Sequence, residues 1–224
     1  MMAYTDKYWK LLIPLMKKEL NKRYGKEYTK ALIAKADGVY RDMLDRVDDV
    51  GEDNPMASNI YECLVVLAIW KAADGKISVS DLREMCTAIL SMPVLKIVGL
   101  FVNGNKESGV RKFRKMIEKD AAWLDEHPEY KDVSWDFHID DTKHQEGFYY
   151  HFTQCPLNNF ARKEGYLEVL PVMCDVDFLT AKLMHFTLHR EHTLAGGGEV
   201  CDYWYVGRRF KKYKVLKQRI KETQ

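Results

Sequence analysis

The spacing of apolar residues changes once along this chain, and that change limits the folds open to it. Before about Glu126, apolar side chains recur every three or four residues, for example at Leu32, Val39 and Met43, which predicts amphipathic helices. After residues 127–128 (His-Pro), apolar and polar residues alternate instead, which is typical of half-buried strands. Helices followed by strands predict an α+β fold.

The first half contains signals that divide it into four or five helices. Residues 54–55 (Asn-Pro) and 91–93 (Ser-Met-Pro) interrupt the helical spacing. Ser78 or Ser80, followed by Asp81, is typical of a helix start with an acidic first turn. We therefore expect an N-terminal helical bundle.

The second half contains signals for about four strands and two helices. We expect strands at about residues 133–140, 148–153, 185–194 and 199–206, and helices at 155–164 and 170–183. Three glycines, residues 196–198, favour a hairpin turn over a phosphate-binding loop, because they lead into a strand and not into a helix. The result is a small antiparallel sheet, with one face covered by helices and by the N-terminal bundle.

The change of spacing also divides the chain into three segments. Residues 1–127 form a helical segment, residues 128–206 form a cysteine-bearing α+β segment that we expect to be catalytic, and residues 207–224 form a basic tail. A length of 224 residues suits two small domains or one large one. The first two segments could therefore form one integrated domain.

Charge and hydropathy argue against two classes of protein. A formal charge of +2, with 30% charged residues, gives no overall reason to expect nucleic-acid binding, and we interpret the basic tail as a solvated helix. The longest apolar run, Leu64 to Trp70, has about a third of the roughly 20 residues that a membrane span needs. Because no signal peptide is recognisable, we expect a cytoplasmic protein without a membrane partner.

The five cysteines indicate reduced thiols, because the number is odd and no export signal is present. Cys63 and Cys86 lie within apolar helical patterns, so we interpret them as small buried side chains. Cys155, Cys174 and Cys201 instead adjoin prolines or acidic residues. These three are candidates for a functional site.

Cys155 precedes Pro156 at the expected start of a helix. The positive end of the helix dipole favours a thiolate there and lowers the pKa of the thiol. Since a thiolate is both a nucleophile and a metal ligand, Cys155 is a candidate for either role.

Cys174 and Asp177 lie three residues apart on the next helix, so they share one face and could serve one pocket. A buried thiol beside a solvated acid is the alternative.

Cys201 and Asp202 are neighbours on an expected strand, where successive side chains point to opposite faces. One of them faces the pocket and the other does not, and we favour Asp202 as a charged partner. Thr193 lies beside the glycine turn, where a bulge could redirect its side chain.

The same three cysteines could also bind zinc, together with Asp177 and a histidine, His189 or His192. No Cys-x-x-Cys pair supports such a site. Zinc therefore stays an alternative, and the motif itself requires no cofactor.

Three short motifs in the last third of the chain form an ordered set. They are Cys155-Pro156, Cys174-x-x-Asp177, and Arg190-x-x-Thr193-Leu194-Ala195 followed by glycines and Cys201-Asp202-Tyr203. In this order and spacing they resemble the L-2-amino-thiazoline-4-carboxylic acid hydrolase family. The resemblance covers roughly residues 148–205, about a quarter of the chain.

The resemblance implies a hydrolase that opens a five-membered cyclic amidine bearing a carboxylate to N-carbamoyl-L-cysteine. It assigns Arg190 and Thr193 to substrate binding, with Arg190 holding the substrate carboxylate through a bidentate pair. It assigns the catalytic positions to Cys155, Cys174, Asp177, Cys201 and Asp202. Where the family commonly has an arginine, Trp204 follows Tyr203, so a related cyclic amidine, thioether or amide is an alternative substrate.

Two chemical routes fit these residues. In the first, which we prefer, Cys155 attacks the amidine carbon and an aspartate manages the protons. In the second, Asp177 or Asp202 activates a water molecule directly. A non-enzymatic module that binds a small ligand or a metal is the alternative from another class of function.

Overall fold

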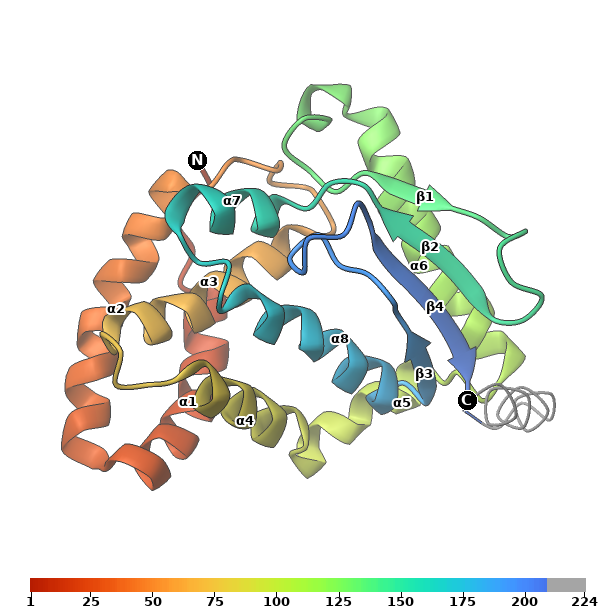
Figure 1. Cartoon of the computed structure of the whole chain (residues 1–224). Helices are drawn as coiled ribbons and strands as arrows, with labels where there is room; N and C mark the ends of the chain where they lie inside the picture. The colour runs from red at the N-terminus through yellow and green to blue at the C-terminus, as the bar shows by residue number, and fades with distance from the viewer. Residues whose placement is uncertain (209–224) are drawn as a thin grey trace.

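The N-terminal helices pack around α3 (Ala57–Ala72), whose sequence is apolar on most sides. Helices α1 (Lys7–Tyr24) and α2 (Lys26–Arg46) lie against α3, and α4 (Val79–Leu90) packs against α1 (Figure 1). The computed structural model describes residues 1–208, so the expected basic tail lies outside the described residues from residue 209 onward. The expected N-terminal bundle is present.

The helix boundaries in this half follow the local signals. Ser78 is the N-cap of α4, where its side chain accepts a hydrogen bond from the Asp81 amide and the Asp81 side chain accepts one from the Ser78 amide. After Pro93 the chain forms a 3-10 helix (Pro93–Ile97) and the one-turn helix α5 (Val98–Phe101), followed by α6 (Glu107–Glu126). The described part thus has six α-helices before residue 127, one more than the upper expectation, because a single turn is too short to give a periodic signal.

Within residues 1–208, no single helix has both the length and the apolar content of a membrane span. Helix α4 and the segment Pro93–Phe101, which meet at a bend of 60°, reach that length and composition when they are taken together.

The second half supplies a four-stranded antiparallel sheet in the order β1-β2-β4-β3. Its strands are β1 (Phe137–Ile139), β2 (Phe148–Phe152), β3 (Phe186–His189) and β4 (Cys201–Gly207). Between β2 and β3 lie α7 (Pro156–Glu164) and α8 (Leu170–Leu183). The α+β prediction is therefore confirmed, and the strand at 148–153 and both helices lie where the sequence predicts them.

The strands expected at 185–194 and 133–140 were predicted too long. The first ends at His189 because the Asp202 side chain accepts the amide hydrogens of Glu191 and His192. A side chain that takes these amides leaves none for the ladder between strands. The second begins late because the amide of Val133 bonds back to Tyr130 in a turn, so β1 keeps three residues.

Alternation along β4 separates the two faces of the sheet, as the sequence predicts. Cys201, Tyr203 and Tyr205 are buried, whereas Asp202 and Trp204 on the opposite face are partly exposed. Helices α6 and α8 cover the buried face: Phe113 of α6 contacts Tyr205, and Asp177 of α8 bonds to Tyr203. One hydrophobic core includes residues of the bundle and of the sheet.

The Ser78 cap can be tested by substitution. Ser78→Ala should lower the free energy of unfolding by about 1 kcal/mol, because the Asp81 amide loses its acceptor. Ser80→Ala, two residues further along α4, is the matched control and should change it by less than about 0.5 kcal/mol. Urea unfolding of both variants is the measurement, and equal losses would contradict the assignment of the cap.

Candidate active site

A cavity of about 240 Å³ lies between the N-terminal bundle and the sheet half. Side chains of α1, α3 and α4 form one wall, and side chains of α7, α8, β2 and β4 form the other, together with Leu194 and Ala195. The N-terminal helices therefore complete the cavity.

All five cysteines line this cavity. It brings together the three candidates from the second half, Cys155, Cys174 and Cys201, as the sequence suggests. It also includes Cys63 and Cys86, whose positions in apolar helical patterns predict small buried side chains. Cys86 is 8% exposed, so its predicted burial is confirmed. Its sequence context does not predict that it lies beside the other cysteines.

Helix α3 contributes polar groups to the cavity that no sequence motif marks. Asn59, Glu62, Cys63 and Val66 all line the cavity. Their spacing of three, four and seven residues places them on one face of the helix. The signal was present in the sequence as two polar residues on one face of an otherwise apolar helix, but nothing in the sequence shows what that face contacts.

Burial raises the pKa of every cysteine in the cavity. The pKa values of Cys155 and Cys174 rise to about 12, and that of Cys86 rises to about 11. The start of α7 is expected from the sequence to lower the pKa of Cys155. This expectation is wrong, because the loss of solvation raises that pKa more than the nearby N–H groups lower it. These upward shifts favour the neutral thiol form at pH 7.

Three nearby N–H groups oppose the effect of burial at Cys155. The amides of Leu157 and Asn158, in the first turn of α7, and the indole of Trp135 lower the pKa of its thiol. Their local effect favours a thiolate, although burial outweighs it.

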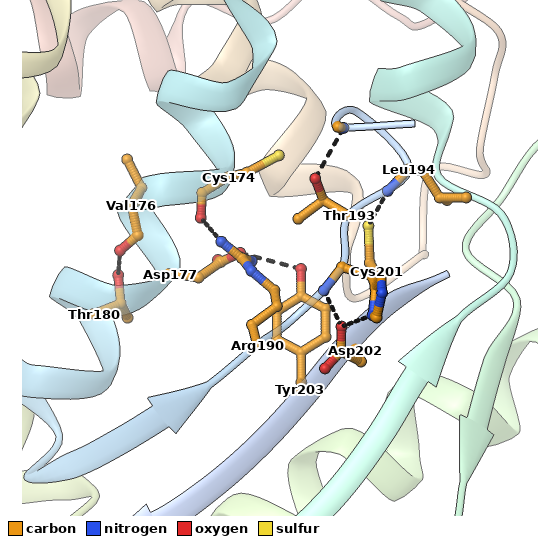
Figure 2. A network of polar contacts seen from close by, with 12 residues as sticks. Cys174, Val176, Asp177, Thr180, Arg190, Thr193, Leu194, Cys201, Asp202 and Tyr203 are labelled. Atoms are coloured by element: carbon orange, nitrogen blue, oxygen red, sulfur yellow. Dashed lines mark hydrogen bonds and ion pairs between the residues drawn. The ribbon is translucent and has the colours of Figure 1, made fainter. Parts of the chain in front are cut away.

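Asp177 of α8 is held by a buried ion pair. Arg190, in the loop after β3, donates from Nη1 to Asp177 Oδ2 at 2.7 Å and from Nη2 to the carbonyl oxygen of Cys174, and the Tyr203 hydroxyl donates to the same Oδ2 at 3.1 Å (Figure 2). The Arg190 side chain is 3% exposed and stacks over the rings of Phe178 and Tyr203. Arg190 does not line the cavity, so its position favours orienting Asp177 over contacting a ligand.

The Asp177 carboxyl group lies deep in the protein and yet faces open space. Its side chain keeps 36% of its accessible surface because it lines the cavity. Burial raises its pKa above the ordinary aspartate value, against the opposing effect of Arg190. Both of its hydrogen bonds go to Oδ2, which leaves Oδ1 available to a ligand.

Thr193 and Asp202 hold the loop between β3 and β4, and neither lines the cavity. Thr193 Oγ1 accepts the Gly196 amide at 2.9 Å, and Asp202 accepts the His192 amide at 2.6 Å (Figure 2). Cys201 faces the cavity and accepts the Leu194 amide at 3.2 Å. The two neighbours on β4 therefore point apart, and the residue that faces the cavity is Cys201 and not the favoured Asp202.

Among residues 1–208, no three His, Cys, Asp or Glu side chains are grouped so that they could bind one metal ion. The zinc alternative therefore has no ligand set in this part of the chain.

The fold and the site define an α+β protein with a buried cavity that carries both thiols and carboxylates. The model of the L-2-amino-thiazoline-4-carboxylic acid hydrolase family matches residues 58–205, which is more than half of the chain. The protein belongs to this family. The match begins in α3 and so includes Asn59, Glu62 and Cys63. No curated protein and no solved structure matches the chain.

The ion pair at Asp177 predicts a large effect on stability. Arg190→Ala should lower the free energy of unfolding by about 3 kcal/mol, because it leaves a buried carboxylate without its partner. Arg83→Ala is the matched control, since Arg83 pairs at 2.8 Å with Asp175 of the same helix while both side chains are 46% exposed. That loss should stay below about 1 kcal/mol. Urea unfolding measures the stability of both variants. Similar losses would show that the Arg190–Asp177 pair contributes no more to stability than the exposed Arg83–Asp175 pair.

Proposed function

We propose that this protein is a cytoplasmic hydrolase that opens a cyclic amidine ring, of the 2-amino-thiazoline-4-carboxylate type, to an N-carbamoyl-cysteine-type product. The observation that carries the proposal is that Cys155 and Asp177, whose hydrogen bonds to Arg190 and Tyr203 both end at Oδ2 and leave Oδ1 for a ligand, line one cavity. The name of the family to which the chain belongs supports the same chemistry. The substrate is a small molecule bound between the two halves.

Cys155 is the proposed nucleophile. Its neutral thiol must lose a proton before or during attack, and burial opposes that loss. A bound amidinium supplies a positive charge in a medium of low polarity, where it favours the thiolate more than it would in water. The N–H groups of Leu157, Asn158 and Trp135, which lower the pKa of Cys155, then favour the negative sulfur, so the substrate itself activates the nucleophile.

The first step forms a covalent adduct. The Cys155 sulfur bonds to the amidine carbon, and the thiol proton passes to Asp177. The bond between that carbon and the ring sulfur then breaks, and the ring sulfur leaves as a thiol by taking the proton from Asp177, which is thereby ionised again. The product of this step is an isothiourea that joins Cys155 to the opened substrate.

The second step restores the enzyme. A water molecule adds to the isothiourea carbon, with Asp177 accepting one of its protons, and the carbon–sulfur bond to Cys155 breaks. Cys155 leaves as a thiol, and the carbon becomes the carbonyl of a urea. The overall reaction consumes one water and releases one ring thiol. Arg190 and Tyr203 act in both steps by holding Asp177 Oδ2, so that Oδ1 faces the substrate.

Substitution of Cys155 separates the covalent route from direct attack by water. Cys155→Ser should lower kcat/KM by about 1,000-fold or more if the sulfur is the nucleophile, measured as release of the ring thiol. Trp135→Phe, which removes an indole N–H that lowers the pKa of Cys155, should lower kcat/KM by about tenfold to a hundredfold. A loss of only a few fold in Cys155→Ser would instead favour water activated by Asp177.

The pH profile tests the role of Asp177. Attack requires the ionised carboxylate, so kcat/KM should fall as the pH falls through the pKa of Asp177. Because burial raises that pKa, the midpoint should lie above the ordinary aspartate value of about 3.9. Asp177→Asn should abolish this acid limb together with most activity, whereas Asp175→Asn, a more exposed position on the same helix, should keep it. An unchanged limb in Asp177→Asn would assign the titration to another group.

A further inference from the structure

A group of exposed apolar side chains follows α4. It consists of Val94, Ile97, Leu100 and Phe101, which are between 53% and 80% exposed, and we call it the apolar corner. These are four of the nine large apolar side chains that are exposed within residues 1–208, and they lie in one short stretch of the chain. Single exposed apolar residues are common on protein surfaces, whereas a group of them is typical of an interaction site.

The helix before the apolar corner is held by the rest of the protein. Four side chains of α4 are buried, namely Leu82, Met85, Cys86 and Ile89, and the last two also line the cavity. Because α4 is retained in the core, only the short segment after it is open to a partner. Such a segment suits contact with a surface and is too short to pass through a membrane.

The charges around the apolar corner are positive. Residues 91–106 include two lysines and no acidic residue. The corner therefore has no negative charge within its own segment that would repel an anionic surface.

The basic tail, residues 207–224, begins beside the apolar corner. The amide of Arg208 donates to the carbonyl oxygen of His185 at 3.1 Å. Gly99 of α5 packs on the same turn, since a Cβ atom there would lie 2.5 Å from the Leu183 carbonyl oxygen and 2.9 Å from His185 Nε2. Figure 1 likewise shows α5 next to β3, which starts at this turn. The chain thus continues into the tail from a point that α5 contacts.

The basic tail reverses the charge of the rest of the chain. The chain has 35 lysines and arginines and 33 aspartates and glutamates, of which the tail contains eight basic residues and one acidic residue. The remainder therefore has 27 basic and 32 acidic residues and is net negative. The eight are Arg208, Arg209, Lys211, Lys212, Lys214, Lys217, Arg219 and Lys221. Such an asymmetry indicates a partner with negative charge.

An anionic lipid surface matches both features. Its headgroups pair with cations, and the boundary between headgroups and acyl chains accepts apolar side chains. Nucleic acid would pair with the cations but would leave the aliphatic side chains of the corner in water. Docking of the tail onto the corner would bring its cations to a segment that has lysines and no acidic residue.

We propose that the apolar corner and the basic tail together attach this protein to the surface of an anionic lipid bilayer. The four side chains of the corner enter the boundary between headgroups and acyl chains, and the cations of the tail pair with the headgroups. The attachment is peripheral, and it does not depend on the proposed hydrolase function. It differs from the sequence-based expectation of a protein without a membrane partner.

Sedimentation with lipid vesicles tests the proposal on the full-length protein. One set of vesicles is phosphatidylcholine alone, and the other contains about 30% phosphatidylserine. We expect the lipid concentration at half-maximal binding to be at least about tenfold lower for the phosphatidylserine vesicles, and to rise with salt because exposed charges are screened. Equal binding to both sets, or binding to neither, would overturn the proposal.

Substitution of Leu100 tests the role of the apolar corner. Leu100→Asp should raise the lipid concentration at half-maximal binding by about tenfold, because it removes apolar surface and adds a negative charge. Leu11→Asp is the matched control, since Leu11 is 55% exposed on α1 and Leu100 is 80% exposed. The control should bind vesicles as the unmodified protein does. Equal binding by both variants would overturn the role of the corner.

The role of the basic tail is measured by removing two of its charges. Lys211→Gln and Lys212→Gln together should raise the lipid concentration at half-maximal binding by about twentyfold, or roughly fivefold for each charge. Lys115→Gln and Lys119→Gln, at exposed positions of α6, remove the same charge elsewhere and should change it by less than about fivefold. Equal effects of the two pairs would overturn the assignment to the tail.

A nucleic-acid partner is excluded by a parallel titration. Fluorescence anisotropy measures the binding of a labelled duplex DNA and of a labelled single-stranded RNA at the salt concentration of the vesicle assay. We expect Leu100→Asp to weaken vesicle binding by a larger factor than it weakens the binding of either nucleic acid. Binding of a nucleic acid without binding of phosphatidylserine vesicles would assign the basic tail to that partner and overturn the proposal.

Discussion

The buried ion pair between Arg190 and Asp177 fixes the part of the structure on which the site depends. It joins the loop after β3 to α8, and the Tyr203 hydroxyl extends the same contact to β4. Charges so far from water are tolerated when they are paired and hydrogen-bonded, and here each partner has a second bond. The loop after β3, helix α8 and strand β4 must therefore take up their positions together, which fixes the arrangement of this cavity wall.

The sequence predicts elements whose signals are local. The α+β class, the start of α4 at Ser78 or Ser80, and the bounds of α7 and α8 follow from periodicity, caps and prolines, because each depends on neighbours within a few residues. The length of β3 does not, because it is decided by Asp202, which accepts the amide hydrogens of Glu191 and His192 from eleven and ten residues away along the chain. A side chain that competes with the ladder is invisible to the apolar pattern.

The candidate site could be predicted only in part, because sequence motifs are also local signals. Cys155, Cys174, Cys201 and Asp177 share a cavity, as their motifs suggest, whereas Arg190, Thr193 and Asp202 support its walls from outside. The motifs include Arg190, Thr193 and Asp202, but the sequence alone does not distinguish a residue that contacts a ligand from one that orients its neighbour. Glu62 and Cys63 were missed because their importance comes from the packing of α3 against the second half of the chain.

The position of the cavity between the two halves has a consequence for the behaviour of the whole molecule. A ligand bound there contacts the bundle and the sheet half at once, and it is lost when either half unfolds. Binding therefore couples the unfolding of the two halves and raises the melting temperature, with a stabilisation that grows as the logarithm of ligand concentration over its dissociation constant. Substitutions deep in the bundle, remote from any reacting atom, would then change catalysis by altering how closely the walls approach each other.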